Sequence, residues 1–466
     1  MKAKDKVKVA SFPSANPFTT KWSGAPPNET EEEAQVRVKL MQEAVRVSKE
    51  IDQSLNEARK AIEKKKKAFK VLLLGQSESG KSSVLKNFQL AFAPKHFEEE
   101  RAIWKIIVQL NLIASIRTIL DALKDEYETP SVPQPTPTES SLRGPAHNLR
   151  RIRLGFSPLF FIETNLIKIL SPDISDPREL CVRAGSGWKE LLGHRGKRAA
   201  DGQESNDRPR SQTVINNEND PTNVLSAQKG DIIALWEDQT VQDILRKRGI
   251  RLEDQSGFFM NDVARIATPE YQPTDSDIIR ARIRTVGVEE HHFLVERGVD
   301  ANSDFYITDV GGTRSQRASW VPYFDDVQAI LFLAPLAFNQ SLEEDSRVNR
   351  LEDSLTLWRD ICGNKLLATA NLILFFNKKD VLNATLAAGV SVKKFVPSYG
   401  NLPNDVPHVT KYFKEKFRNY HRKMSPMARP FMCYETSAID ITSMAVLLMG
   451  VRESILRQHL RDGDII

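Results

Sequence analysis

Apolar positions along the chain follow two periods, and each period predicts a different kind of element. Over residues 30–67 they recur at spacings of three and four, which predicts one long helix with a single apolar stripe. The helix starts acidic at 31–33 and ends basic at 64–67, as its dipole favours. The stripe fits packing on the chain's own domain or docking of another subunit, and the pattern leaves both open. Its residues are Leu40, Ala44, Val47, Ile51, Leu55, Ala58 and Ile62.

Short apolar runs farther along the chain predict buried strands, and helical spacing between the later runs predicts helices. The result is an α/β arrangement with a mostly parallel sheet. The predicted strands are 71–74, 305–308, 329–333 and 371–376, and two of the predicted helices cover 104–123 and 159–170.

Three segments break this order. Residues 1–30 carry four prolines and are predicted to be a flexible arm. Residues 129–145 are rich in proline, and residues 193–223 are polar. Both are predicted to be disordered insertions, because they lack the apolar residues that a packed core requires.

Composition excludes several classes of protein. The 466 residues carry a net charge of only +5, which does not point to nucleic acid as a partner. The three cysteines show no paired spacing, so neither a disulfide framework nor a zinc site is expected. No apolar run approaches the roughly 18 to 20 residues of a membrane span. The N-terminus lacks a signal peptide, and Lys2 stands where N-myristoylation requires glycine.

The first chemical motif is Gly-Gln-Ser-Glu-Ser-Gly-Lys-Ser at residues 75–82, directly after a predicted strand and before a helix. Glycines let backbone amides wrap phosphate groups. Lys81 would reach the β- and γ-phosphates, and the Ser82 hydroxyl would bind Mg²⁺. A strand, loop and helix in this order favour a phosphate-binding loop over a chance match.

Two further motifs also follow predicted strands. In Asp-Val-Gly-Gly at 309–312, Asp309 suits a carboxylate near Mg²⁺ and the Gly312 amide could contact a γ-phosphate. In Asn-Lys-Lys-Asp at 377–380, the Asp380 carboxylate can accept both hydrogen bonds that guanine offers from N1 and its exocyclic amine. Adenine offers no such pair, so the motif selects guanine. Each motif is weak alone, and their order after the phosphate-binding loop makes them specific.

A fourth motif, Thr-Ser-Ala-Ile-Asp at 436–440, could hydrogen-bond the guanine carbonyl oxygen through the Ala438 amide. Together the ordered motifs resemble a regulatory GTPase. Three further segments resemble heterotrimeric G-protein α subunits. The segment 101–121 resembles the first helix of their inserted helical domain. The segment 262–287 resembles their second linker with switch I, and the segment 314–320 resembles their switch II. An unrelated kinase with a phosphate-binding loop is contradicted by the 377–380 motif.

The resemblance implies a Ras-like GTPase domain, at 68–90 and 280–466, interrupted by an all-helical domain at 91–279. The arm and amphipathic helix at 1–67 precede them. It also implies GTP or GDP bound with Mg²⁺, an arginine finger at Arg282, and metal ligation by Thr285 beside Ser82 and Asp309. The implied nucleotide contacts are Glu78, Ser79, Gly80, Lys81, Ser82, Ser83, Asp309, Gly312, Asn377, Lys378, Asp380 and Ala438.

Departures from the family pattern concern hydrolysis. The family has a glutamine after Asp-x-Gly-Gly that orients the attacking water, and here the residue is Thr313. Threonine is about two bonds shorter, so we expect slow hydrolysis with binding intact. Ser77 replaces a usual glycine beside the γ-phosphate position. The chain is therefore expected to be either a slow GTPase or a module that holds nucleotide and barely hydrolyses it. Another side chain or a regulator could instead position the water.

The family's partners are implied too. They are a βγ dimer, a seven-helix receptor that binds the C-terminal tail, and a downstream effector that the sequence does not identify. Ala318 and Ser319 replace usual switch II lysines, while Trp320 remains as a candidate βγ contact. The tail ends in Ile465 and Ile466. Without a lipidation motif, the protein is expected to be cytoplasmic and to reach the inner face of the plasma membrane through partners.

Overall fold

The computed structural model describes residues 30–128, 151–170, 180–183, 220–296, 304–325 and 327–462. The chain divides into two compact units, Met1–Ala68 and Phe69–Ile466. The predicted arm, the proline-rich segment 129–145 and the C-terminal isoleucines lie outside the described residues, as does most of the polar segment 193–223.

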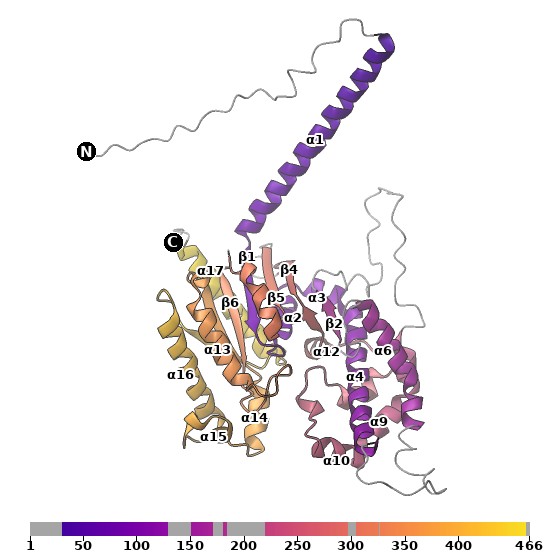
Figure 1. Cartoon of the computed structure of the whole chain (residues 1–466), viewed down its shortest axis with the longest axis vertical. Coiled ribbons are helices and arrows are strands. Elements are labelled where there is room, and N and C mark those ends of the chain that lie inside the picture. Colours follow the sequence, from indigo (N-terminus) through magenta and orange to yellow (C-terminus); the bar gives the residue numbers. More distant parts are fainter. Residues whose placement is uncertain are drawn as a thin grey trace, which may run out of the picture. The chain divides into compact units, whose positions relative to one another are not determined.

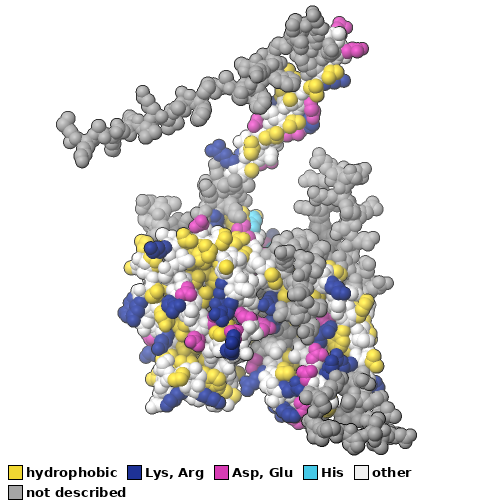
Figure 2. Space-filling view, viewed as in Figure 1, with side chains coloured by type: hydrophobic (Ala, Val, Ile, Leu, Met, Phe, Trp, Pro, Cys, Tyr) yellow, Lys and Arg dark blue, Asp and Glu magenta, His cyan; other side chains and the backbone are white. Residues whose placement is uncertain are grey.

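The first unit consists of helix α1, Glu31–Lys67, as the spacing of apolar residues predicts. Its apolar stripe is exposed: Leu40, Val47, Ile51 and Leu55 keep between 40% and 63% of their surface accessible. Figure 2 shows these apolar side chains along the helix.

The second unit is built on a six-stranded sheet of order β4-β5-β1-β6-β7-β8 (Figure 1). Every neighbouring pair is parallel except β4 and β5, which are antiparallel. The mostly parallel α/β sheet is therefore confirmed, and the four strands expected from the sequence are all present. The strands are β1 (Phe69–Gly75), β4 (Val288–Leu294), β5 (Asp304–Val310), β6 (Ala329–Pro335), β7 (Asn371–Asn377) and β8 (Met432–Glu435).

The central strands are apolar throughout because both faces of the sheet are covered. In β1, Val71 and Leu73 face a core shared with helices α2 and α17, whereas Leu72 and Leu74 face a core shared with α13 and α16. The edge strand β4 carries four charged or histidine side chains in a row, so no apolar pattern predicts a strand there. The covering helices are α2 (Lys81–Phe92), α13 (Arg350–Gly363), α14 (Lys379–Ala387), α15 (Val392–Phe395), α16 (Val406–Met424) and α17 (Ile441–Asp462).

A second group of helices has a core of its own between α2 and β3 in the chain (Figure 1). Helix α4, Arg101–Glu128, supplies most of its central residues, including Ile107, Ile113 and Ile116, which are fully buried. The others are α3 (Pro94–Glu99), α6 (Ser157–Leu170), α8 (Pro221–Ala227), α9 (Lys229–Glu237), α10 (Gln239–Lys247), α11 (Val263–Ile266) and α12 (Asp275–Arg280), with the short strands β2 (Cys181–Arg183) and β3 (Arg284–Val286) paired beside them.

Two expectations need correction. By length and composition, the segment Arg101–Tyr127 is apolar enough to cross a membrane, contrary to the prediction that no such run exists; 78% of its most apolar window is buried, so it is a core helix. The polar segment 193–223 was predicted to extend through 223, but α8 begins at Pro221. Asp220 caps it by accepting from the Thr222 amide, and proline suits the first helical turn.

The helix that leads into the segment around Arg282 is held by a buried carboxylate. Asp277 of α12 is 1% exposed and accepts hydrogen bonds from both terminal nitrogens of Arg265, at 2.6 and 2.8 Å. It also accepts from Tyr271 and from the Thr274 amide, which completes a capping box. A buried carboxylate with this many donors depends on all of them.

Replacing Arg265 with alanine is expected to lower the free energy of unfolding by about 2 kcal/mol, because it leaves the Asp277 charge buried without its main partner. This expected loss of unfolding free energy is small for a buried ion pair because the Arg265 side chain is itself 42% exposed. Urea unfolding of the full chain measures it. The matched control is Arg246→Ala, which breaks the exposed pair with Asp243 and should change stability little. Equal effects of the two variants would contradict this account.

The same carboxylate makes stability depend on pH. Burial by itself raises the pKa of Asp277, but the hydrogen bonds from Arg265 and Thr274 outweigh it and hold the pKa below its usual value. Because the folded pKa is depressed, this contribution is fully present above the unfolded pKa of about 4 and is lost as pH falls below it.

Candidate functional site

The phosphate-binding loop connects β1 to α2 and is shaped by its glycines. Gly80 adopts a left-handed conformation with φ of 100°. A Cβ at this position would lie 2.2 Å from the Asn377 side-chain nitrogen, so the loop requires glycine for space as well as for conformation. Lys81 at the start of α2 points back over the loop and donates to the carbonyls of Gly75 and Gln76, at 3.0 and 2.7 Å. Burial lowers the pKa of Lys81 to about 8.

Asn377 joins three of the motifs. Its side-chain nitrogen donates to the Ser79 carbonyl at 2.7 Å. Its side-chain oxygen accepts from the Ala438 amide at 2.9 Å and from the Thr436 hydroxyl at 3.3 Å. Segments that are about 300 and 60 residues apart in the chain are thereby fixed to one another. A fully satisfied buried amide of this kind specifies a single arrangement.

Gly312 lies directly against the phosphate-binding loop. A Cβ at this position would be 2.3 Å from the carbonyl carbon of Gln76 and from the Ser77 amide nitrogen. Only glycine permits this approach, which brings the start of the segment after β5 to the loop. A ligand that enters between Gly312 and the phosphate-binding loop must therefore displace one of them.

Ser82 and Asp309 form a pair of oxygen ligands suited to a hard cation. The Ser82 hydroxyl donates to one Asp309 carboxylate oxygen at 2.8 Å. The other oxygen is buried and has no hydrogen-bond partner among the described residues. Burial raises the pKa of Asp309, and the Lys81 charge opposes that rise. An unsatisfied carboxylate oxygen beside a hydroxyl fits Mg²⁺, which prefers few protein ligands together with phosphate oxygens.

No cluster of three or more histidine, cysteine or acidic side chains that could hold a metal without phosphate occurs in the described ranges. Thr285, on β3, lines the same pocket as Ser82 and Asp309. Three oxygen-bearing side chains are therefore gathered in one pocket.

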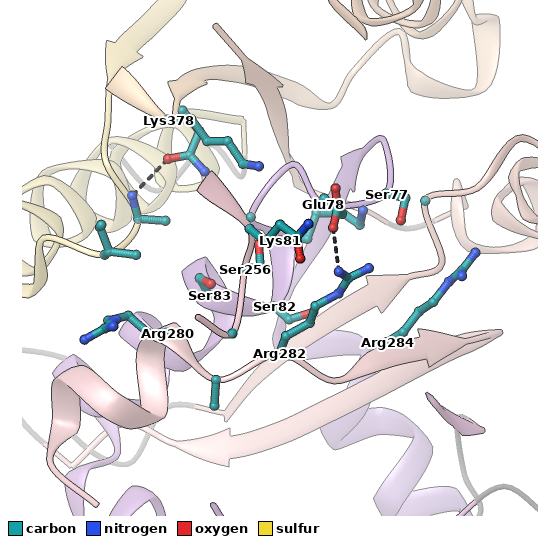
Figure 3. Close-up of a pocket in the computed structure, with 18 of the residues that line it drawn as sticks. Ser77, Glu78, Lys81, Ser82, Ser83, Ser256, Arg280, Arg282, Arg284 and Lys378 are labelled. Atoms are coloured by element: carbon teal, nitrogen blue, oxygen red, sulfur yellow. Dashed lines mark hydrogen bonds and ion pairs between the residues drawn. The ribbon is translucent and has the colours of Figure 1, made fainter. Parts of the chain in front are cut away.

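Arg282 reaches the phosphate-binding loop from the segment that follows α12. Its guanidinium pairs with Glu78 at 2.9 Å and with Glu343 at 3.3 Å. Figure 3 shows the Arg282 side chain extended toward Glu78 across the pocket. The backbone of Arg282 is clamped by Asn111 of α4, whose side chain accepts from the Arg282 amide at 2.6 Å and donates to its carbonyl at 2.8 Å. The helical group thus positions the arginine.

Three positively charged side chains surround the Glu78 carboxylate. Its backbone has a left-handed φ of 59°. Burial alone would raise the pKa of Glu78, but Arg282, Lys378 and Arg350 together hold it below its usual value. Arg350 is 3% exposed and also donates to the Ser77 carbonyl at 3.0 Å. The carboxylate therefore stays ionised and anchors the two arginines at the loop.

The opposite end of the pocket is formed by the loops after β7 and β8. Lys378 has a left-handed φ of 61°, which turns the chain sharply into α14. Asp380 is exposed and accepts a hydrogen bond from the Ser437 hydroxyl at 2.7 Å. The Ala438 amide lies beside Asn377. Asp380 and Ala438 both line the pocket, and the Asp380 carboxylate is an acceptor suited to the edge of a purine.

One pocket gathers most of the residues that the sequence singles out (Figure 3). Two of them, Ser79 and Thr313, are buried beside the pocket instead of lining it. The predicted residues in the lining are Glu78, Gly80, Lys81, Ser82, Ser83, Arg282, Thr285, Asp309, Gly312, Asn377, Lys378, Asp380 and Ala438.

Trp320 has a different setting from the one expected of a partner contact. It is 2% exposed, and its indole nitrogen donates to the Gly311 carbonyl at 2.9 Å. In this conformation the ring is part of the core, and the exposed apolar side chains of the segment are Val321 and Tyr323. Trp320 therefore fastens the segment after β5 to the Asp-Val-Gly-Gly turn.

Sequence reasoning missed several residues at the site. Glu343 precedes α13 and Arg350 begins it, far from any recognised motif. Asn111 is one of several polar residues of α4, so no pattern in the sequence singled it out. Gln316 also lines the pocket, although it lies outside the Asp-Val-Gly-Gly motif.

Comparison with known proteins adds independent information. The model of the family described as G-protein alpha subunit matches residues 45–455. The chain is 31% identical to the guanine nucleotide-binding protein alpha-4 subunit of Mycosarcoma maydis, over 85% of this chain and 84% of that protein. It is 28% identical to the alpha-2 subunit of the same organism, over 89% and 94%. It is 27% identical to the alpha-16 subunit of Caenorhabditis elegans, over 90% and 96%.

Proposed function

The chain belongs to the family of G-protein α subunits, and from this premise we propose that it is a guanine-nucleotide-dependent switch that binds GTP or GDP with Mg²⁺ and hydrolyses GTP slowly. The observation that carries the proposal is the Asn377 amide, which ties the phosphate-binding loop to the loop of Ala438 around one pocket. This arrangement supports phosphate contacts at one end of a single cavity and purine contacts at the other.

The proposed role of each residue follows from its position in the pocket. Lys81 and the loop amides bind the β- and γ-phosphates, and Asp380 with the Ala438 amide binds the guanine edge. Ser82, Thr285 and Asp309 would hold Mg²⁺, which neutralises phosphate charge when bound. Arg282 moves from Glu78 to the γ-phosphate and stabilises charge there as the bond breaks.

The proposed domains are the Ras-like part at 68–90 and 280–466 and the helical part at 91–279, with the arm and α1 at 1–67. We also propose that the protein works in the cytoplasm at the inner face of the plasma membrane. There it would be held by a βγ dimer and a seven-helix receptor and would act on a downstream effector. The exposed apolar stripe of α1 supports a docking role for that helix.

A second candidate is a module that holds nucleotide with little or no hydrolysis. The replacement of the family's glutamine by Thr313 favours it. The two candidates differ in one measurable quantity, the rate at which bound GTP turns into GDP. Guanine binding is common to both, so the test of the proposed site concerns the base.

Replacing Asp380 with asparagine is expected to weaken GTP binding about 30-fold, because a hydrogen bond to a charged acceptor contributes about 2 kcal/mol and the asparagine amide would face a guanine donor. Xanthosine triphosphate, with a carbonyl in place of the exocyclic amine, should gain affinity. Competition against a fluorescent GTP analogue measures both, and ATP should fail to compete with the native protein.

The matched control is Lys379→Ala in the same loop, since Lys379 pairs with Glu435 at 2.7 Å and does not line the pocket. It should bind GTP nearly as the native protein does. Competition by ATP equal to that by GTP would exclude the proposed base contact.

A further inference from the structure

The threonine that stands in place of the family's glutamine does not reach the nucleotide pocket. Thr313 is 6% exposed and caps the 3₁₀ helix η4, Arg314–Tyr323. Its hydroxyl is turned along that helix, 2.8 Å from the Gln316 side-chain oxygen and 3.3 Å from the Ser315 hydroxyl. The position after Gly312 therefore offers no group to a water molecule beside the γ-phosphate.

Gln316, three residues later, does reach the pocket. Thr313 precedes η4 in an extended backbone conformation, whereas Gln316 lies in the first turn of that helix. Its amide lies against Gly311: a Cβ on that glycine would be 2.2 Å from the Gln316 oxygen and 3.0 Å from its nitrogen. A glutamine side chain is thus present beside the Asp-Val-Gly-Gly turn, but it comes from the next turn of helix.

Two hydrogen bonds orient this amide. The Thr313 hydroxyl donates to the Gln316 side-chain oxygen at 2.8 Å, and the Gln316 backbone amide donates to the Thr313 carbonyl at 2.9 Å. The side-chain oxygen keeps a second lone pair, and the side-chain nitrogen carries two hydrogens that donate to no acceptor in the described part of the chain. An acceptor and a donor held together are what a water attacking a phosphoryl group requires.

Two other side-chain amides near the pocket already donate hydrogen bonds elsewhere. Asn377 donates to Ser79 and accepts from Ala438. The Gln76 nitrogen is 2.6 Å from both the Arg350 carbonyl and an Asp353 carboxylate oxygen, and Arg317 from η4 pairs with the same carboxylate at 2.6 Å. These contacts hold η4 close to the phosphate-binding loop and keep Gln316 beside it.

We propose that Gln316 is the catalytic residue that positions the attacking water in this chain and that Thr313 is its positioning residue, an inference that rests on the proposed GTP-binding function. The Gln316 oxygen accepts a hydrogen from the water while its nitrogen donates to the γ-phosphate. The water oxygen forms a bond to the γ-phosphorus, and the bond from that phosphorus to the bridging oxygen of the β-phosphate breaks. The products are GDP and inorganic phosphate, which carries the protons of the water.

Single-turnover hydrolysis of preloaded GTP, started with Mg²⁺, tests the assignment, and binding of a non-hydrolysable GTP analogue is measured separately. Gln316→Ala is expected to hydrolyse GTP about tenfold more slowly than the native chain, with analogue binding unchanged, since one water-positioning contact is lost. Val321→Ala is the matched control: it lies on the same 3₁₀ helix, is 49% exposed, and should keep the native rate.

The role of Thr313 is tested by conservative variants. Thr313→Val removes the hydroxyl that orients Gln316 and should slow hydrolysis severalfold, whereas Thr313→Ser keeps the hydroxyl and should restore the native rate. A purely structural role for the threonine would not produce this recovery. In a Thr313→Gln background, a glutamine is available at 313, so adding Gln316→Ala should have little further effect.

Several outcomes would overturn the assignment. If Gln316→Ala binds the analogue and hydrolyses GTP at the native rate, Gln316 does not position the water. The same holds if the native chain binds GTP but does not hydrolyse it at all. Failure of the native chain to bind any guanine nucleotide would instead overturn the proposed function itself, and the separate binding measurement tells these results apart.

Discussion

Replacing Arg282 with alanine is expected to slow hydrolysis of bound GTP by about 10²-fold while nucleotide affinity changes little, since removing one donor to developing charge typically costs this much in rate. Its guanidinium lies 2.9 Å from Glu78 of the phosphate-binding loop, and Asn111 clamps its backbone on both sides. The Arg282 backbone is therefore held in place close to the phosphate-binding loop. The stabilisation that its guanidinium provides grows as the phosphoryl group gains charge.

Single-turnover hydrolysis after preloading with GTP measures this effect without interference from product release. Arg246→Ala is the control: it removes an exposed arginine that pairs with Asp243 and does not line the pocket, so it should hydrolyse GTP near the native rate. Arg282→Lys keeps the charge but loses the planar fork, so it should recover only part of the rate. An Arg282→Ala protein with unchanged hydrolysis would exclude the arginine from the reaction.

Replacing Thr313 with glutamine is expected to accelerate hydrolysis by about 10²-fold, because misplacement of a reacting group by roughly 1 Å costs a factor of this size. Glutamine at this position would extend about two bonds farther than threonine, from the residue directly after Gly312. That glycine contacts Gln76 and Ser77 so closely that the residue after it starts at the phosphate-binding loop. The longer side chain would then reach the water without the detour through Gln316.

Thr313→Ser serves as the control for this experiment, since serine is as short as threonine and should give no acceleration. The same preloaded single-turnover assay applies. Equal rates for the native chain and Thr313→Gln would mean that position 313 does not limit hydrolysis, and the expectation of a slow native enzyme would be wrong.

Much of the fold was predictable because its signals are local. The apolar runs of β1, β6 and β7 are continuous, since each of these strands is covered on both faces. The strand β4 was not predictable from the same reasoning: it lies at the edge, pairs antiparallel to β5, and carries Glu289, Glu290, His291 and His292 in sequence. An edge strand buries too little to leave an apolar pattern.

The candidate site divides in the same way. The phosphate-binding loop and the 377–380 motif are each a short run of consecutive residues, so both could be predicted from the sequence. Asn111, Arg350 and Gln316 act through contacts between segments that lie far apart or through helical geometry. No residue pattern in 314–323 predicts that η4 is a 3₁₀ helix. The sequence therefore does not predict whether position 313 or position 316 faces the pocket.

Tryptophan fluorescence of the full chain tests whether it is a guanine-nucleotide-dependent switch. Emission is compared with Mg²⁺ and GDP, a non-hydrolysable GTP analogue or the matching ATP analogue. Trp320 is buried and bonded to Gly311 beside the pocket, so a γ-phosphate that displaces Gly312 from the loop must change its surroundings. We expect the GTP analogue to change the emission relative to GDP, the ATP analogue to leave it unchanged, and Trp320→Phe to abolish the change. Identical emission with GDP and the GTP analogue, or an equal response to the ATP analogue, would contradict the proposed switch.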